Sequence, residues 1–548
     1  MENQRTLLYF ALLFLVYLLW AQWQNDYAPR PEVTVSPERT EQIGSSEMDS
    51  DVPPPISAVA PGAEVEDRPA AASSSQTISI ITDVLEVEIS TRGGDLRKAT
   101  LRKYAVDADK QDEKVDLLTE SRTNFHVAQS GLVSANKDTA PTHNAVYSAE
   151  QDSYRLAEGV DEIKVPLYWT GKDGTRVTKV YTFRRNDYTI NVDHDIAAGE
   201  KGWSGSQYMQ LYRTEPTDEN ESMFIHTYTG GVIYNDEIKY EKIDFGDMQE
   251  KNLNRELENG WLAMIQHYFL IAWITDSDEK HLYFSRYNPD SGRYILGTRS
   301  SAKRLQAGEQ SSFNSRLVVG PKLQDRLAEV QPGLELTVDY GILTIIAKPL
   351  FWLLNQYHNL FGNWGWAIIF LTITVKALFF KLSAMSYKSM AKMRKVAPRM
   401  KQMKEQFGDD RQAMSKAMME MYKREKINPM GGCLPILVQI PVFISLYWVL
   451  LESVEMRQAP FMLWLTNLSA RDPYFILPLL MGISMFVQQK LNPAPVDPVQ
   501  QKIFQFMPIG FTVMFAFFPS GLVLYWVVNN LLSIAQQWVI TRRIENEK

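Results

Sequence analysis

Cysteine and histidine are scarce in this chain of 548 residues, which contains one Cys and seven His. Cys433 cannot form an intrachain disulfide, so any exported domain has to be held by its own core. The sequence has no metal-ligand cluster, no phosphate-cradling Gly-rich loop and no Ser/His pair within its apolar segments. It also lacks the internal repeat expected of a transporter. These absences argue against an enzyme and against a solute transporter, and we expect no cofactor.

Charge is divided unevenly along the chain. Residues 21–340 contain 34 Lys and Arg against 52 Asp and Glu, a net charge of −18, whereas residues 341–548 contain 22 against 11, a net charge of +11. Long apolar segments show the same division, since one lies at the extreme N-terminus and the others follow Gly341. Length favours two or more domains. The sequence therefore predicts an acidic domain followed by a basic membrane half.

The first apolar run extends from Thr6 to Ala21 and fits either a secretory signal or a retained anchor. Only Arg5 precedes it as a basic residue, and the following LLWAQWQ lacks the small residues of a cleavage site. We therefore predict a membrane anchor helix over residues 1–24. Residues 25–76 are rich in Pro, Ser, Ala and acidic side chains without an apolar period, which predicts a disordered periplasmic linker.

Alternation of apolar and polar residues with period two begins at Thr77. This alternation predicts strands at 84–89, 177–183 and 188–192, while Gly93-Gly94, Lys172-Asp173-Gly174 and Gly230-Gly231 are interpreted as turns. The pattern indicates a large, mostly antiparallel, all-β sandwich over residues 77–333. A helical pattern returns at 322–327, where this domain ends.

The membrane half begins with a mixed segment. Residues 334–360 carry Asp339, Lys348 and His358 among apolar residues, so we predict an interfacial amphipathic helix that Pro349 breaks. A membrane helix is predicted over 361–384. Four more are predicted within 431–540, at roughly 431–452, 473–490, 503–518 and 520–540, the last two as an antiparallel hairpin around Pro519. With the N-terminal anchor, the chain would have six spans.

Basic residues indicate which side of the membrane each loop occupies. Residues 388–426 hold twelve Lys and Arg against five acidic side chains, so the positive-inside rule places this loop in the cytoplasm. An even number of spans then leaves both termini in the cytoplasm, with residues 541–548 as a cytoplasmic tail. The β domain falls on the outer side.

Residues 385–430 also carry apolar side chains at spacings of three and four, interrupted near Gly408. This pattern predicts a helical hairpin. Ten of the 22 Met lie here, and they fit either the seam between the two helices or a surface that accepts apolar partners. The basic face fits solvent, anionic lipid or ribosomal RNA. The residues that we expect to contact partners are Met393, Arg394, Lys395, Arg399, Met400, Met403, Asp409 and Asp410.

One cation lies inside an apolar run. Lys376 falls within WGWAIIFLTITVKALFFK, one helical turn after Thr372 and on the same face. A charge inside a membrane helix costs several kcal/mol and usually faces protein or water rather than lipid, so Lys376 predicts a wet cavity within the membrane. In the last predicted span Trp526, Asn530, Ser533 and Gln537 form one stripe, and Gln439 lies within LVQIPVF. Each of these fits interhelical hydrogen bonding, but together with Lys376 they favour a shared polar groove.

Several long segments resemble a known family. The segments KMRKVAPRMKQMKEQFGDDRQAMSKAMMEMYKREKINPMGGCLPILVQIPVFISLY, VEMRQAPFMLWLTNLSARDPYFILPLLMG and DPVQQKIFQFMPIGFTVMFAFFPSGLVLYWVVNNLLSIAQQ closely resemble the YidC family of bacterial membrane protein insertases. TDVLEVEISTRGGDL and HYFLIAWI look like its Gram-negative form, which has a large periplasmic β-supersandwich. The resemblance covers essentially the whole chain.

This resemblance implies a multi-pass protein of the bacterial inner membrane. Such a protein would insert other membrane proteins and help them fold, alone or with the Sec translocon, and without nucleotide hydrolysis. Its five-helix core would enclose a hydrophilic groove open to the cytoplasm. The implied partners are nascent membrane proteins, the Sec translocon with its accessory subunits, the ribosome, the signal recognition particle and its receptor, and anionic lipids.

The family also implies specific groove residues. It places a cation on the second span, usually Arg, and that position is Lys376 here. A lysine retains the charge but not the planar fork that binds a carboxylate through two hydrogen bonds. Trp526 stands where similar proteins often have Tyr. Thr372, Gln439, Asn530 and Ser533 complete the predicted groove.

Overall fold

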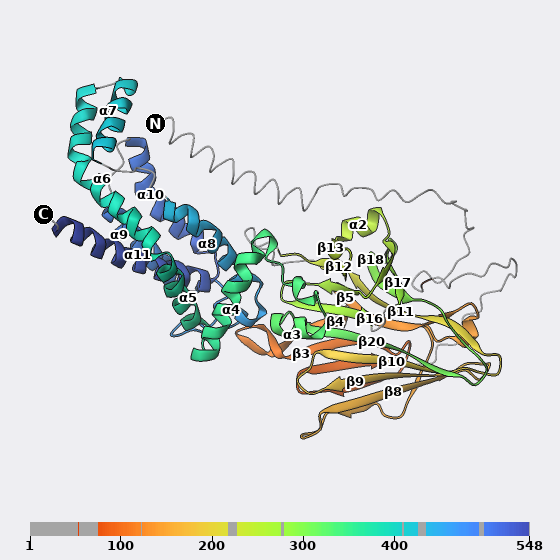
Figure 1. The fold of residues 1–548 in the computed structure, drawn as a ribbon. Coiled ribbons are helices and arrows are strands. Elements are labelled where there is room, and N and C mark those ends of the chain that lie inside the picture. The colour runs from red at the N-terminus through yellow and green to blue at the C-terminus, as the bar shows by residue number, and fades with distance from the viewer. Residues whose placement is uncertain are drawn as a thin grey trace. The chain divides into compact units, whose positions relative to one another are not determined.

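The computed structural model describes residues 53, 75–121, 123–216, 227–275, 279–407, 410–425, 434–492 and 498–546. These residues form two compact units, one of strands that ends at Val338 and one of helices that begins at Asp339 (Figure 1). The predicted anchor over 1–24 lies outside the described residues, and so does the predicted linker except for Pro53, Ser75 and Gln76.

The strand unit consists of two large sheets. Its strands are β1 (Thr77–Ile81), β2 (Leu85–Ser90), β3 (Asp95–Asp107), β4 (Lys110–Glu120), β5 (Phe125–Ser134), β6 (Ser148–Ala149), β7 (Ser153–Arg155), β8 (Glu162–Thr170), β9 (Arg176–Arg184), β10 (Thr189–Ala197), β11 (Trp203–Thr214), β12 (Gly230–Asn235), β13 (Lys239–Ile243), β14 (Asn254–Glu258), β15 (Trp261–Ile265), β16 (Phe269–Thr275), β17 (Lys280–Asn288), β18 (Arg293–Ser300), β19 (Lys303–Leu305) and β20 (Gln310–Pro321). One sheet has the order β14-β17-β18-β11-β5-β4-β3-β2-β1-β7, with β19 also paired to β11. The other has the order β13-β12-β15-β16-β20-β10-β9-β8-β6.

The pairing confirms the predicted mostly antiparallel sandwich. Of the strand pairs in these sheets, β1 and β7 run parallel. Side chains from both sheets share one core, where Leu132 and Trp203 of the first sheet pack with Val177, Ile196 and Phe313 of the second. Strand β2 shows how the sequence produces this packing, because its alternate residues Leu85, Val87 and Ile89 are buried while those between them are partly exposed.

Glycine turns were predicted correctly at two places and wrongly at a third. Gly93, Gly94 and Gly174 have positive φ angles, as turns of this kind require. Gly230 and Gly231 instead begin strand β12. They are glycines because of close packing: a Cβ on Gly231 would lie 2.7 Å from the side chain of Met248.

Short helices accompany the sheets. They are η1 (Lys137–Thr139), α2 (Phe245–Glu250), α3 (Gln324–Val330) and η2 (Leu334–Thr337). Helix α3 confirms the helical pattern predicted near 322–327.

The helical unit contains ten helical segments in the described residues. They are η3 (Gly341–Leu343), α4 (Thr344–Phe361), α5 (Trp364–Leu378), α6 (Phe380–Phe407), α7 (Arg411–Arg424), α8 (Leu434–Glu452), η5 (Val454–Met456), α9 (Ile476–Leu491), α10 (Pro498–Phe515) and α11 (Ser520–Asn546). Helix α4 continues through Pro349, so the predicted break there is wrong. Pro349 lies in the second turn, where its missing N–H costs one hydrogen bond near the helix start.

The helix predicted over 361–384 is interrupted. Helix α5 ends at Leu378, α6 begins at Phe380, and the two axes are bent by 67°. No Pro or Gly occupies the bend, and Gln536 of α11 donates a hydrogen bond to the carbonyl of Phe380 there, over 3.2 Å. The break therefore coincides with a contact from the neighbouring helix α11. The sequence around the break does not reveal this contact.

Lengths and neighbours of the other helices also differ from the prediction. Among the described residues, no single helix has both the length and the hydropathy required to cross a bilayer, and α5 with Phe380–Val396 of α6 meets this requirement only as a bent pair. Six spans therefore stay a prediction. Helix α10 packs mainly against α9, which also packs against α11, rather than forming the predicted hairpin with α11.

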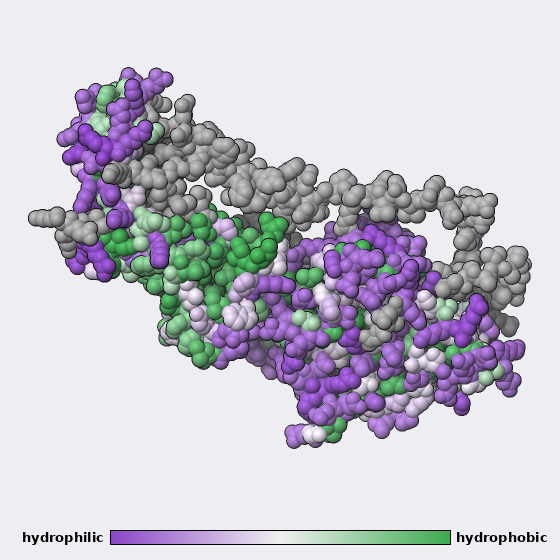
Figure 2. All heavy atoms as spheres, in the orientation of Figure 1, coloured by the Kyte–Doolittle hydropathy of each residue, from purple (hydrophilic) through white to green (hydrophobic). Residues whose placement is uncertain are grey.

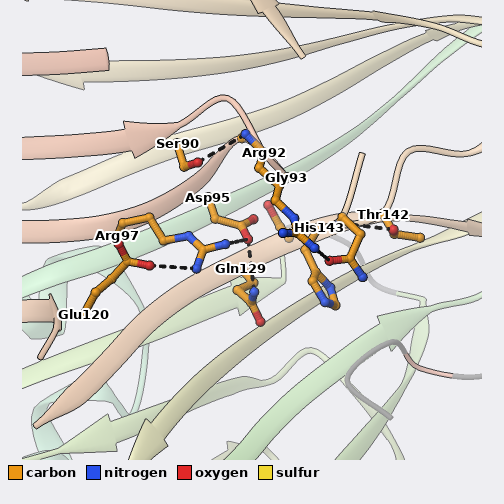
Figure 3. Close-up of polar contacts among 12 residues, drawn as sticks. Ser90, Arg92, Gly93, Asp95, Arg97, Glu120, Gln129, Thr142 and His143 are labelled. Carbon is orange, nitrogen blue, oxygen red and sulfur yellow. Dashed lines mark hydrogen bonds and ion pairs between the residues drawn. The ribbon is translucent and has the colours of Figure 1, made fainter. Parts of the chain in front are cut away.

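A buried ion pair lies inside the strand unit. Asp95 and Lys179 are fully buried, with Lys179 Nζ 3.8 Å from a carboxylate oxygen of Asp95. The same Nζ donates to the carbonyls of Gly93 (3.0 Å) and Ser130 (2.9 Å). Figure 3 shows the other Asp95 oxygen accepting from Arg97 and Gln129. The Lys179 ammonium thus has two hydrogen-bond acceptors, while the Asp95 oxygen that faces it is held by the ion pair and has no hydrogen bond within the described residues.

We expect Lys179 to make the stability of the strand unit depend on pH. Burial lowers the pKa of Lys179 to about 8, although Asp95 opposes this shift, whereas an unfolded chain has a lysine pKa of about 10.4. Between these values the unfolded chain holds a proton that the folded chain lacks. The free energy of unfolding should therefore rise with pH in that window, by up to about 3 kcal/mol, and fall as pH decreases through 8.

The measurement is urea unfolding of residues 75–338 from pH 7.5 to 10.5, with Lys179→Met for comparison. Other groups titrate alike in both proteins. As pH rises, the unfolding free energy of wild type should therefore increase relative to that of Lys179→Met. A difference that stays constant across this range would contradict the assignment.

Candidate functional site

Polar side chains from three helices meet within the helical unit. Helix α11 packs against α5 and α9, and the facing side chains form what we term the Lys376 cluster. Its members are Thr372 and Lys376 of α5, Ser484 of α9, and Asn530, Ser533 and Gln537 of α11; all are buried. The stripe predicted on the last helix is therefore confirmed for the three α11 residues.

Within the described residues, the cation of this cluster has one hydrogen-bond partner. Lys376 is 8% exposed, and its Nζ donates to Ser533 Oγ over 2.7 Å. Ser533 Oγ in turn donates to the carbonyl of Asn529, one turn earlier on α11, over 2.7 Å. Across the described residues no carboxylate forms a salt bridge with Lys376. In the part of the chain that the structure describes, the ammonium is therefore held by one neutral hydroxyl.

The other contacts of the cluster join α11 to α9. Asn530 Nδ2 donates to Ser484 Oγ over 3.0 Å, and that hydroxyl donates to the carbonyl of Met481. Gln537 Nε2 donates to the carbonyl of Leu491 and to Asn492 Oδ1. These bonds fit the interhelical role that the sequence left open for Asn and Gln.

The remaining predicted groove residues are less closely connected. Thr372 donates to the carbonyl of Ile368 on its own helix. Trp526 lies between the rings of Phe443 (4.9 Å) and Phe515 (5.5 Å), and its indole N–H has no partner among the described residues. Gln439 is half-buried on α8, and within the described part of the chain no hydrogen bond joins it to the Lys376 cluster.

Sequence reasoning missed Ser484, and it also missed Ser383 and Ser386, which are buried on α6. Serine is common enough in apolar helices that one Ser in GISMF does not stand out. The spacing of three between Ser383 and Ser386 was the available signal, because it places both on one helical face.

The predicted hairpin consists of α6 and α7, which pack against each other (Figure 1). Val396 and Met421 are buried in the seam, and the side chains packed against them are Met393, Met400, Met403 and Tyr422. The Tyr422 hydroxyl also donates to Met400 Sδ over 3.7 Å. The sequence left two interpretations open for the methionines of this hairpin. For Met393, Met400 and Met403, the structure supports packing in the seam between the two helices.

Charged residues of the hairpin lie outside the seam. Arg399 pairs with Glu425 at 2.8 Å, and Asp410 caps α7 by accepting from the backbone N–H of Ala413. Arg394 and Lys395 are exposed, whereas Asp409 lies outside the described residues. Figure 2 shows a mainly hydrophilic hairpin next to a mainly hydrophobic body of the helical unit. The hairpin therefore presents basic side chains to water.

Neither unit offers a metal centre in the described residues, because no three His, Cys, Asp or Glu side chains approach one another suitably. What the helical unit provides is a buried cation with a neutral partner.

Two families match the chain in sequence. Residues 77–353 match the family described as YidC periplasmic domain, and residues 356–547 match that described as 60Kd inner membrane protein. The chain is 53% identical over 561 residues to "Membrane protein insertase YidC" of Thioalkalivibrio sulfidiphilus (strain HL-EbGR7), which covers 100% of this chain and 99% of that protein. The protein of the same name from Methylococcus capsulatus is 51% identical over 547 residues, again covering 100% and 99%.

A solved structure was also found. The crystal structure titled "Active YidC insertase crystal structure with the first transmembrane domain resolved" covers 85% of this chain and 92% of its own chain, with 18% identity and a TM-score of 0.39.

The seam predicts which hairpin residues hold α6 and α7 together. Met421 is 5% exposed, so Met421→Ala should weaken the hairpin by about 2 kcal/mol or more. Glu425→Gln removes an ion pair between partly exposed side chains and should cost only about 0.5 kcal/mol. Amide hydrogen exchange of α7 would measure the loss of hairpin stability in each variant. Met419→Ala is the matched control, since Met419 is 41% exposed on the same helix. Equal loss of protection in both Met variants would argue against the seam.

Proposed function

Because the chain belongs to the YidC family of membrane protein insertases, we propose that its Lys376 cluster receives polar parts of a client protein during insertion. The chain is an insertase of the inner membrane with a periplasmic domain, and not an enzyme. We propose that the cluster lines a hydrophilic groove open to the cytoplasm and closed toward the periplasm. Lys376 would attract acidic residues that flank the client's apolar segment.

The observation that carries this proposal is that, among the described residues, Lys376 has one partner and that this partner is neutral. An ammonium removed from water is stabilised best by an anion, and the attraction between charges is stronger where the surroundings are apolar. Ser533 supplies one hydroxyl and no charge. A client carboxylate would therefore gain more at Lys376 than it would at an exposed lysine. Water and the buried polar side chains of α11 would solvate the rest of the client's polar flank.

The client's apolar segment would leave along exposed apolar faces of the helices. Helix α10 exposes Ile503, Phe506, Ile509 and Val513, and α8 exposes Val438 and Ile444. Burying roughly 20 apolar residues in lipid is strongly favourable at about 25 cal/mol per Å². Nucleotide hydrolysis is not required by this scheme.

The proposed topology has six spans, with both termini in the cytoplasm and the β domain in the periplasm. In this arrangement the span after α4 is the bent pair formed by α5 and the first turns of α6. Helices α8 to α11 would supply the next four spans, and α4 would lie at the interface. The twelve basic residues within 388–426 support a cytoplasmic hairpin.

The hairpin would make the first contact with partners. Its exposed basic residues suit ribosomal RNA, anionic lipid headgroups and acidic surfaces of the signal recognition particle or its receptor. Nascent membrane proteins are the clients, and work beside the Sec translocon and its accessory subunits would add a chaperone role in folding. The exposed positions Arg394 and Lys395, rather than the seam methionines, are the contact residues in this proposal.

The charge of Lys376 should decide insertion of an acidic client. In proteoliposomes, Lys376→Arg should insert a short single-span client with an acidic tail about as well as wild type, whereas Lys376→Ala and Lys376→Glu should reduce insertion at least about tenfold. Loss of one charge-assisted contact of roughly 1.5–3 kcal/mol accounts for such a factor. Protease protection of the translocated tail gives the yield.

A client whose tail carries Asn in place of Asp is the matched control, and it should respond little to these substitutions. Equal insertion of the acidic client by all four proteins would reduce Lys376 to a solvated structural charge.

Removal of residues 395–420 should abolish insertion while leaving the rest of the protein folded. This deletion takes out half of the hairpin seam, namely Val396, Met400 and Met403, but none of the Lys376 cluster. The readouts are client insertion and the unfolding of the strand unit, which should stay at the wild-type temperature. Arg394→Gln with Lys395→Gln keeps the seam and tests the exposed charges alone. Wild-type insertion by the deleted protein would refute a role for the hairpin.

A further inference from the structure

Ser533 occupies an unusual position in the Lys376 cluster, because it accepts a hydrogen bond from the cation and donates one to a helix carbonyl. Lys376 Nζ lies 2.7 Å from Ser533 Oγ, and Ser533 Oγ lies 2.7 Å from the carbonyl oxygen of Asn529. A hydroxyl has one proton, and here that proton is committed to Asn529. Toward Lys376 the hydroxyl therefore acts only as an acceptor.

This arrangement makes the Lys376–Ser533 bond easy to exchange. If Lys376 leaves, Ser533 keeps its bond to Asn529, so no buried donor is left unsatisfied. The lysine stem is flexible and can move the ammonium. An ammonium bound to a carboxylate has a shorter and stronger hydrogen bond than an ammonium bound to a neutral hydroxyl. An anionic group is thus favoured over Ser533, whereas a neutral amide gains little by replacing it.

Ser533 also lies beside the bend between α5 and α6. Gln536, three residues later on α11, donates to the carbonyl of Phe380 at the start of α6. Helix α11 therefore holds the chain on both sides of the bend, at Lys376 before it and at Phe380 after it. The Lys376–Ser533 bond ties the last turn of α5 to α11.

We propose that Ser533 is a latch for Lys376, a positioning residue that holds the ammonium against α11 until an acidic side chain of a client displaces it. This inference rests on the proposed function, because it takes the client to be a membrane protein that reaches the cluster. It goes further in assigning the charge selectivity of the site to competition between a carboxylate and the Ser533 hydroxyl.

The test compares wild type, Ser533→Ala, Ser533→Thr and Ser445→Ala in proteoliposomes. Ser445 is the matched control, since it is a buried hydroxyl that bonds Pro441 of its own helix α8. One readout is the rate at which an amine-reactive reagent labels Lys376, followed by mass spectrometry. The second is carbodiimide coupling of Lys376 to a single-span client that carries one Asp in its tail, with an Asn client for comparison.

Ser533→Ala should raise both the labelling rate and the coupling to the Asp client, each by about tenfold or more, because the loss of one hydrogen bond to a charged group corresponds to factors of this size. Ser533→Thr and Ser445→Ala should match wild type. Unchanged labelling in Ser533→Ala, or weaker coupling to the Asp client, would overturn the latch. If wild type inserts both clients in that case, the proposed function stands without the latch. If wild type inserts neither client, the proposed function itself fails.

Discussion

A charge removed from water needs partners, and the two units of this protein meet that requirement in different ways. Lys179 of the strand unit has the Asp95 carboxylate and two backbone carbonyls around its Nζ. Lys376 of the helical unit has one neutral hydroxyl. A fully surrounded ammonium can do little except stabilise its own fold, whereas an ammonium with one exchangeable partner can bind something else. Both lysines are buried, so the number and charge of the partners, rather than burial, distinguish Lys179 from Lys376, for which we propose a role in client binding.

Helix α11 is the element on which the helical unit depends for this arrangement. It contacts α5 through Ser533, α6 through Gln536 and α9 through Asn530 and Gln537. These polar contacts occur at successive turns of one face, so a single helix sets the positions of three neighbours. Apolar packing alone specifies helix positions loosely, because one methyl-bearing side chain replaces another at small cost. Directional hydrogen bonds across the helices fix the arrangement in which Lys376 meets Ser533.

How much could be predicted depended on how far each signal reaches along the chain. The strands around Val87, Val180 and Val192 followed from period two, and the α6–α7 hairpin followed from spacings of three and four, since both patterns are local. Gly230-Gly231 was interpreted wrongly, because Met248 and Tyr228, which crowd these glycines, are not visible in the local pattern. The bend at Phe379 has no local mark. The partner of Asn530, Ser484, comes from a helix 46 residues earlier.

The sequence by itself determined the division into an acidic strand domain and a basic helical half, the polar stripe on α11, and the presence of a cation in an apolar helix. It determined these because composition and periodicity are properties of continuous segments. Only the tertiary structure decided which groups meet. It joined Lys376 to Ser533 over 157 residues, placed Met393, Met400 and Met403 in a seam, and packed α9 against both α10 and α11. The physical reason is that hydrogen bonds and packing act between atoms within a few ångströms, and one chain's periodicity does not say which of its faces will lie that close together.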